Sequence, residues 1–407
     1  MPSLDFYSYL CSVKRFNLTI RTLGVFILCV VFLLPVKAEK YDPLAYMDSV
    51  EFSLITCSPH EEIYSLYGHT ALRFHDLHEG RQEDVVFNWG VFSFKAPFFV
   101  ARFVFGLTDY ELEIAPFEAF CRYYKRWGSS VTEQVLNLTS EEKLALNLAL
   151  EENYQPENRV YRYNYFYDNC STRPRDIIER SIKGKIVYEQ REDYEPSFRE
   201  MIHAKTRHHD WATFGNDMLL GVKADMKTTR REQEFLPENL LYDFDHARIN
   251  GADGRWRPLV KERRQPVAPG VQAKERDFFC TPTECAMLLL VVSVLVFMAE
   301  WRRKTTYKYW DAALMTLTGL AGCVLFVMIF SQHPTTSLNL QLLLVNPVHL
   351  FYLPAVLRRW QTRYWLVLSA MAVLFLGGRL FQDYAAGMVT LALCLLTRVW
   401  SHIKHEK

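Results

Sequence analysis

A cysteine and a histidine in the first half of the chain have the surroundings of a nucleophile and its base. Cys170 lies in Tyr167-Asp-Asn-Cys-Ser-Thr-Arg173, and Pro174 just after it fits only in the first turn of a helix. The positive end of a helix dipole favours a thiolate, and a nearby imidazole would complete a Cys/His pair. His69 follows a glycine and leads into a strand-like segment. These residues predict nucleophilic acyl chemistry, with Cys170 as nucleophile and His69 as base.

Neighbouring polar residues are candidates for supporting roles. His75, Asp168 and Asn169 are each candidates for the group that orients the imidazole of the base. Arg73 and Arg173 could hold a phospholipid headgroup, because guanidinium suits phosphate, but ordinary salt bridges explain them equally well. No third residue stands out, so the sequence leaves the complete constellation open.

The other cysteines are weaker candidates. Cys57 is close to the histidine motif, but Leu54-Ile-Thr-Cys57-Ser-Pro is typical of the end of a buried strand, where a free cysteine acts as a small hydrophobe. In an oxidising compartment it could instead pair with Cys121. Cys280 and Cys285 lack further ligands at zinc spacing, which favours a local disulfide or two free thiols over a metal site.

A group of histidines raises the question of a metal. His203, His208, His209 and Asp210 lie close together before a tryptophan. This pattern is more typical of a polar helix end than of a metal site. We expect neither a metal nor a cofactor.

The segments that must position these residues have a mixed pattern. Residues 72–76 and 85–89 have strand-like composition and a turn between them. Residues 140–150 predict a helix capped at Ser140, and residues 161–167 alternate like a strand edge. The exported part of the chain is therefore predicted to have a coarse α/β pattern.

Composition disfavours several classes of protein. The chain has 407 residues, with 47 Lys and Arg against 46 Asp and Glu, and its formal net charge is +1. A charge near zero gives no basic footprint, so nucleic-acid binding is disfavoured. Half of the residues are hydrophobic and 14% are aromatic, which disfavours disorder. The length suits about two domains.

The N-terminus predicts export. A basic flank precedes the apolar stretch 23–34, which is followed by a small-residue site that ends at Ala38. This is the pattern of a secretory signal peptide, and the stretch is short for a membrane span. An uncleaved anchor is the alternative. We therefore predict a signal peptide at residues 1–38 and an exported domain at residues 39–280.

The remainder of the chain, residues 281–407, predicts a membrane domain. Five apolar segments approach the length that crosses a bilayer core, at about residues 284–299, 311–331, 338–357, 364–380 and 384–400. Basic residues, among them Arg302, Arg358 and Arg398, gather after the first, third and fifth segments, so these loops are predicted to be cytoplasmic. The exported domain is then on the opposite side, and the C-terminus is cytoplasmic.

The loop at residues 331–340 is accordingly expected on the outer side, level with the exported domain. Asn339, Asn346 and His349 carry polar groups into the third segment, where such groups usually face a cavity or a neighbouring helix. Helix-packing contacts and a part in lipid or substrate access both remain open. His333, in the same loop, is a further candidate substrate residue.

Aromatic residues are unusually dense after the second predicted strand. They are Phe87, Trp89, Phe92, Phe94, Phe98, Phe99, Phe103 and Phe105. They could belong to the core, or they could hold an acyl chain at the bilayer surface.

The chemical motifs resemble a known family. Residues 55–73 together with 167–173 look like the Lnb family, membrane-bound lipoprotein N-acyltransferases of Bacteroides-type bacteria with a periplasmic domain and a C-terminal membrane domain. The resemblance extends through residues 211–221, 235–237 and 333–347, and so covers nearly the whole mature chain.

The order of the two motifs also has a parallel. A strand histidine followed by a helix cysteine is similar to circularly permuted papain-like enzymes such as the lecithin:retinol acyltransferase group. By that analogy His69 is the base and Cys170 the nucleophile. The expected fold is a permuted papain-like α+β domain followed by an all-α transmembrane domain of about five helices.

The resemblance implies a reaction and its partners. A phospholipid would donate a fatty acyl chain through a cysteine thioester to the N-terminal amine of a diacylated lipoprotein. The enzyme would act at the bacterial inner membrane, without a cofactor and without nucleic acid. The alternatives are a membrane-anchored cysteine hydrolase, acting on cell-wall peptide or phospholipid, and a non-enzymatic scaffold that binds lipoproteins.

Overall fold

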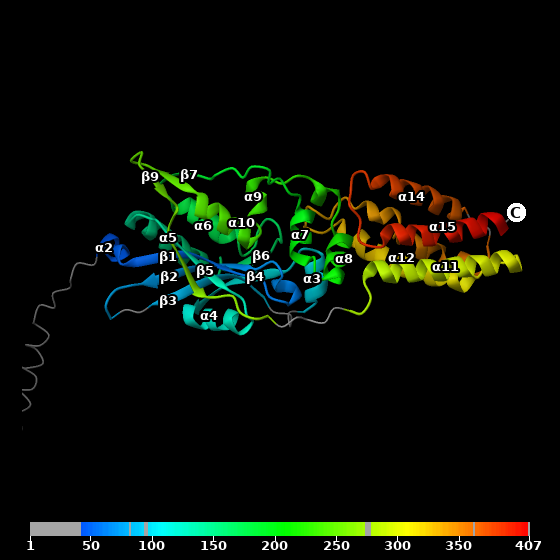
Figure 1. Ribbon diagram of the computed structural model, residues 1–407, viewed down its shortest axis with the longest axis horizontal. Coiled ribbons are helices and arrows are strands. Elements are labelled where there is room, and N and C mark those ends of the chain that lie inside the picture. Colours follow the sequence, from blue (N-terminus) through cyan, green and yellow to red (C-terminus); the bar gives the residue numbers. More distant parts are fainter. Residues whose placement is uncertain (1–41, 81–82, 93–96, 273–277, 361–362, 406–407) are drawn as a thin grey trace, which may run out of the picture. The chain divides into compact units, whose positions relative to one another are not determined.

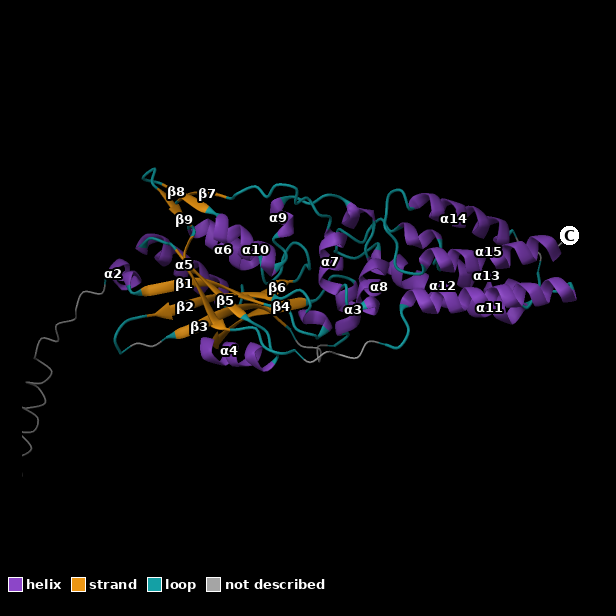
Figure 2. Cartoon of the chain, viewed as in Figure 1, coloured by secondary structure: helices purple, strands orange, loops and turns teal. Residues whose placement is uncertain are grey.

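The computed structural model describes residues 42–80, 83–92, 97–272, 278–360 and 363–405. The predicted signal peptide lies outside the described residues. The first described helix is α2 (Pro43–Asp48). From residue 47 onward the described residues belong to one compact unit, which has a sheet-rich N-terminal part and a helical C-terminal part (Figure 2).

A seven-stranded antiparallel sheet forms the centre of the N-terminal part (Figure 1). Its strand order is β10-β5-β1-β2-β3-β4-β6. The strands are β1 (Val50–Cys57), β2 (His69–Asp76), β3 (Asp84–Val91), β4 (Asp109–Pro116), β5 (Val131–Leu136), β6 (Val160–Arg162) and β10 (Val260–Val267). A second sheet of three strands contains β7 (Gly184–Val187), β8 (Arg248–Gly251) and β9 (Trp256–Pro258).

Helices cover both faces of the large sheet. Side chains alternate along a strand, so His69 and Ala71 of β2 share a face. Helix α4 (Phe117–Arg126) lies on that face, where Phe120 and Tyr124 pack in one cluster with Ala71. The opposite face is covered by α5 (Ser140–Tyr154), α6 (Thr172–Ser181) and α10 (Pro237–His246) (Figure 1).

Most of the predicted local elements are confirmed. The two strand-like segments lie in β2 and β3, and α5 begins at Ser140. The cap of α5 is Thr139 rather than Ser140, because Thr139 and Glu142 form a reciprocal capping box. The predicted strand at residues 161–167 is wrong beyond Arg162. There the chain turns, and Asn164 and Asp168 exchange backbone hydrogen bonds of 3.0 and 2.9 Å.

The N-terminal part contains further short helices. They are η1 (Ile63–Ser65), α3 (Phe99–Val104), α7 (Phe198–Thr206), α8 (Asp210–Leu219), η2 (Val222–Asp225) and α9 (Arg230–Gln233). The predicted polar helix end is confirmed, because α7 ends at Thr206, three residues after His203, and His209 occupies the N-cap position of α8. His203 contacts Asp217 at 2.8 Å, and no His, Cys, Asp and Glu side chains in the described ranges gather as a metal site.

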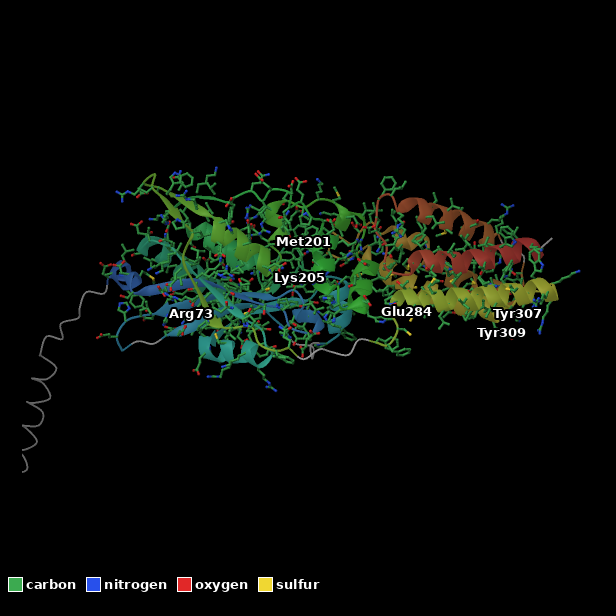
Figure 3. The ribbon with its side chains drawn as sticks, in the orientation of Figure 1. Arg73, Met201, Lys205, Glu284, Tyr307 and Tyr309 are labelled. Carbon is green, nitrogen blue, oxygen red and sulfur yellow. The ribbon has the colours of Figure 1, made fainter. Side chains whose placement is uncertain are left out.

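The C-terminal part contains α11 (Pro282–Arg303), α12 (Lys308–Met328), η3 (Leu340–Leu343), α13 (Val348–Leu357), α14 (Tyr364–Gly378) and α15 (Met388–His405). Within the described residues, three helical segments are long and apolar enough to cross a membrane: Pro282–Arg303, Lys308–Met328 and Leu340–Leu357. Residues 364–378 form a shorter apolar helix. Helix α11 begins with a capping box between Thr281 and Glu284, the latter labelled in Figure 3.

The polar residues predicted at the third segment are bonded inside the protein. Asn339 donates to the carbonyl of Met218 at 2.7 Å, and Asn346 donates to that of Leu342 at 2.8 Å. His349 contacts the hydroxyl of Tyr364 at 2.7 Å and the carbonyl of Leu344 at 3.0 Å. These contacts favour the packing interpretation of these three side chains.

Arg398 is not a loop charge as the sequence predicted. It lies inside α15, is 1% exposed, and pairs with Glu300 of α11 at 2.7 Å and Asp311 of α12 at 2.6 Å. Ser401 and His402 bond the same two carboxylates at 2.6 and 2.9 Å. This buried ionic cluster joins three helices through charged side chains.

Replacing Arg398 with methionine should destabilise the helical part strongly. The substitution leaves two buried carboxylates without their cation, a change that costs about 3–5 kcal/mol in comparable buried pairs. Thermal unfolding in detergent should show a lower melting temperature for Arg398→Met. The matched control is Arg303→Met, at an exposed arginine that ends α11. Equal melting temperatures for the two variants would contradict the structural role of the cluster.

Candidate active site

The structure brings the two predicted catalytic side chains together. His69 is the first residue of β2, and Cys170 lies two residues before the start of α6. Their side chains are hydrogen-bonded to each other. Gly68 makes the approach to β2 possible: its φ is +78°, and a Cβ there would lie 2.8 Å from the carbonyl oxygen of Cys57.

Asn88 of β3 is the third member of this constellation. The Nε2 atom of His69 lies 2.6 Å from Asn88 Oδ1, which can only accept, so Nε2 carries a proton and Nδ1 is the ring nitrogen left for the thiol. Strand pairing explains the contact. Leu72 of β2 lies opposite Phe87 of β3, so the next pair in this register is Ala71 opposite Asn88. His69 is two residues from Ala71 and on the same face of the sheet, which makes it a diagonal neighbour of Asn88.

The sequence did not reveal this third residue. Asn88 is a polar residue between Phe87 and Trp89 in a largely apolar strand, which is the only local signal it gives. Asp168 and His75 were two of the predicted candidates. Among the hydrogen bonds of the described residues, neither is bonded to the imidazole of His69. The carboxylate of Asp168 instead holds Arg173.

Asn169 holds the turn that presents the cysteine. It is 4% exposed, and its Oδ1 accepts from the backbone N–H groups of Ser171 at 2.8 Å and Thr172 at 3.0 Å. Its Nδ2 donates to the carbonyls of Tyr165 and Phe235, both at 2.9 Å. The predicted polar cap of α6 is therefore confirmed, and Asn169 positions the nucleophile rather than the base.

The electrostatics of the pair favour a thiolate and an imidazolium. Burial by itself would raise the pKa of Cys170, but the charge and hydrogen bond of His69, the backbone of Thr70 and the hydroxyl of Ser171 lower it overall. Burial would lower the pKa of His69, but the charge and hydrogen bond of Cys170 and the hydrogen bond to Asn88 raise it overall. Opposite shifts of this kind activate a cysteine nucleophile.

An aromatic cavity of about 520 Å³ opens onto the pair. This volume lies within the usual range of small-molecule sites. The cavity wall includes Phe92, Phe103, Tyr110, Phe120, Tyr163 and Phe235. Of the dense aromatic run, Phe87 and Trp89 belong to the core, whereas Phe92 and Phe103 line this cavity. Phe94 lies outside the described residues.

Comparison with known proteins identifies two family models in the chain. The Lnb N-terminal periplasmic domain matches residues 38–204, and the Lnb transmembrane domain matches residues 273–407. The chain belongs to the Lnb family. No curated protein and no solved structure matches it.

Membership of the Lnb family agrees with the arrangement of the chain. The two family descriptions indicate an inner-membrane protein with a periplasmic N-terminal domain and a transmembrane C-terminal domain. They suggest a membrane enzyme that modifies lipoproteins. The matches confirm the resemblance that the Cys170 and His69 motifs carried.

The two arginines predicted as candidates for binding a headgroup, in this chain of the Lnb family, are bound by carboxylates. Arg73, labelled in Figure 3, is 8% exposed and pairs with Asp84 at 2.7 Å and Glu133 at 2.8 Å. Arg173 pairs with Asp168 at 2.6 Å. Their guanidinium groups form salt bridges within the protein, which was the alternative to binding a phospholipid headgroup.

Two of the remaining predicted residues lie away from the nucleophile, whereas Cys57 lies opposite His69 in the sheet. His75 is six residues along β2 from His69, a distance of about 20 Å at the usual rise per residue. His333 lines a different cavity and contacts the ring of Phe103 at 6.2 Å between centroids. Cys57 is a free, buried thiol at the end of β1, and burial raises its pKa, so it is unsuited to be the nucleophile.

Alkylation of Cys170 should depend on pH in a way set by His69. The lowered pKa of Cys170 means that its thiolate persists below the ordinary thiol value of about 8.5 and is lost only as the pH falls through the lowered value. His69→Ala removes the charge that lowers it. At about pH 6.5, iodoacetamide labelling of Cys170 should slow at least about tenfold in this variant.

Peptide mass spectrometry measures this rate separately from the other cysteines, and Cys170→Ser gives the blank. His69→Gln tests whether loss of the imidazolium, rather than a cavity, causes the effect. If the pH midpoint of Cys170 labelling were the same in both His69 variants as in the wild type, the ion pair would be ruled out.

Asn88→Ala should weaken the site without abolishing it. The imidazole keeps its bond to the thiol but loses the acceptor that fixes its ring. Acylation of Cys170 by a p-nitrophenyl ester should slow at least about tenfold, less than the roughly 10²–10⁴-fold expected when a base is removed. Asn88→Asp retains an acceptor oxygen and should recover part of the rate. Wild-type acylation in Asn88→Ala would show that Asn88 does not orient the base.

Proposed function

We propose that this chain is a lipoprotein N-acyltransferase that works through a cysteine thioester. The observation that carries the proposal is the hydrogen-bonded set of Cys170, His69 and Asn88 at an aromatic cavity, in a chain of the Lnb family. A thiolate is suited to attack an acyl ester, and an apolar cavity of this size is suited to a fatty chain.

The first half-reaction would acylate the enzyme. The thiolate of Cys170 attacks the carbonyl carbon of a phospholipid ester, so that a C–S bond forms and the C–O bond to glycerol breaks. The imidazolium of His69 gives its proton to the departing glycerol oxygen.

The second half-reaction would pass the acyl group to the acceptor. The N-terminal amine of a diacylglyceryl-modified cysteine attacks the thioester, so that a C–N bond forms and the C–S bond breaks. His69, now neutral, takes the proton of the amine, and the thiolate–imidazolium pair is restored. The reaction requires no cofactor, because the attacking and leaving groups exchange only one proton through His69.

The arrangement of the chain in the membrane is part of the proposal. Residues 1–38 are the signal peptide, residues 39–280 the periplasmic catalytic domain, and residues 281–407 a five-span domain with a cytoplasmic C-terminus. Helices near all five apolar segments support this arrangement. The order of a strand histidine, a strand asparagine and a helix cysteine supports a permuted papain-like relationship.

Mass spectrometry of the full-length protein tests this function. Incubation with phospholipid alone should give a fatty-acyl adduct on Cys170. Addition of a synthetic diacylated lipopeptide should remove the adduct and produce the N-acylated lipopeptide. Cys170→Ala should give neither product.

The alternatives predict different products. An adduct that decays only to free fatty acid would favour a cysteine hydrolase. Full complementation of a deletion strain by Cys170→Ala would favour a non-enzymatic scaffold. Either result would overturn the proposed acyl transfer.

A further inference from the structure

The catalytic cavity adjoins a second, smaller cavity. The second cavity has a volume of about 90 Å³, and its wall includes Leu219, Met328, His333 and Thr335. The two cavities share Phe103 and Tyr165 in their walls. These two aromatic side chains therefore separate the space around Cys170 from the space beside the end of α12.

The second cavity lies where the sheet-rich part meets the helices of the membrane domain. Met328 is the last residue of α12, one of the segments suited to cross a membrane. Four residues later, the backbone N–H of Gln332 donates to the carbonyl of Phe105 at 3.1 Å. This bond places the end of α3 within one short turn of the end of a spanning helix.

Gly106 allows this close approach. Its φ is +68°, and a Cβ at this position would lie 3.2 Å from both the Cβ and the backbone nitrogen of Gln332. Only glycine meets both requirements without moving the neighbouring loop. The segment after α3 is thus fitted closely against the 331–339 loop.

Apolar side chains remain exposed around this junction. Phe103, Phe105 and Leu107 are 39%, 37% and 36% exposed, and Phe330 and Leu338 are 67% and 61% exposed. Phe330 and Leu338 follow the end of α12, and the segment with Phe103, Phe105 and Leu107 is bonded to the same loop. Exposed apolar side chains at the end of a spanning helix are suited to contact with lipid chains.

The physical cost of moving a fatty chain favours a route at this junction. A chain that passes through water exposes its methylene groups, and each exposed group adds to the unfavourable free energy. A chain that moves from lipid directly into an apolar cavity avoids this cost. His333 does not oppose such a route, because burial lowers its pKa and keeps its imidazole neutral.

We propose that the acyl chain of the donor phospholipid reaches Cys170 sideways from the outer leaflet, through the smaller cavity beside the end of α12 and past Phe103. The inference rests on the proposed acyl transfer and adds its lipid route. Phe103 is a residue that determines selectivity for long chains, because it lies in the walls of both cavities. The headgroup then remains at the membrane surface while the ester approaches the thiolate.

A comparison of two acyl donors tests the route. Wild-type protein in lipid nanodiscs is supplied with dipalmitoyl phospholipid or with soluble p-nitrophenyl butyrate, and each adduct on Cys170 is measured by mass spectrometry. Phe103→Trp enlarges the side chain between the cavities. The ratio of the palmitoylation rate to the butyrylation rate should fall at least tenfold. Phe98→Trp makes the same substitution at a phenylalanine that is 83% exposed and lines neither cavity, so its ratio should equal that of wild type.

An unchanged ratio in Phe103→Trp would overturn the route, whether both rates are normal or both fall together. Failure of the proposed function would look different, because neither donor would then acylate Cys170 in the wild type. A phospholipid with a photoreactive group at the end of its acyl chain gives a second measurement that does not need turnover. In Cys170→Ala it should label peptides containing residues 103–107 or 328–338. Labelling confined to other parts of the protein would also overturn the route.

Discussion

The proton shared between Cys170 and His69 is the interaction on which the rest of the site depends. A buried thiolate is unfavourable without a nearby positive charge, and a buried imidazolium is unfavourable without a nearby negative one. Each group therefore stabilises the charged form of the other. The surrounding structure holds them in contact: Asn88 fixes the ring, and Asn169 fixes the turn that carries the thiol.

This pair is built between two kinds of secondary structure. The imidazole comes from a central strand, whose position is set by pairing on both sides, and the thiol comes from the turn before a helix on the sheet. A hydrogen bond of 2.9 Å between Thr70 and Ser171 joins the strand to the turn beside the reacting atoms. This bond fixes the position of the thiol relative to the sheet, as catalysis by positioned groups requires.

Charged and polar groups serve a different purpose in the helical part. Arg398 with Glu300 and Asp311, and Asn339 with the backbone of Met218, satisfy one another inside the protein. The first set joins three helices, and the second joins the membrane domain to α8. Polar side chains in the apolar segments therefore join neighbouring helices to one another. The apolar side chains near α3 take no part in these bonds and are available to lipid.

The sequence alone determined the features that depend on short stretches of chain. Strand-like composition predicted β2 and β3, Pro174 and the polar run before it predicted the start of α6, and long apolar runs predicted the helices of the C-terminal part. Local residue types control these features because backbone preference and capping act over a few residues. The choice of Cys170 and His69 also followed from local settings and from the resemblance to the Lnb family.

Tertiary structure decided which side chains meet. Asn88 became a partner of His69 only through the register of β2 against β3, and a shift of one residue would have turned it to the other face. The sequence predicted Arg398 as a loop charge, whereas the packing of three helices places it in a buried ion pair with Glu300 and Asp311. Phe103 gained its place between two cavities because a loop more than two hundred residues later lies against α3. Contacts between distant segments depend on packing and register, which no short stretch of sequence encodes.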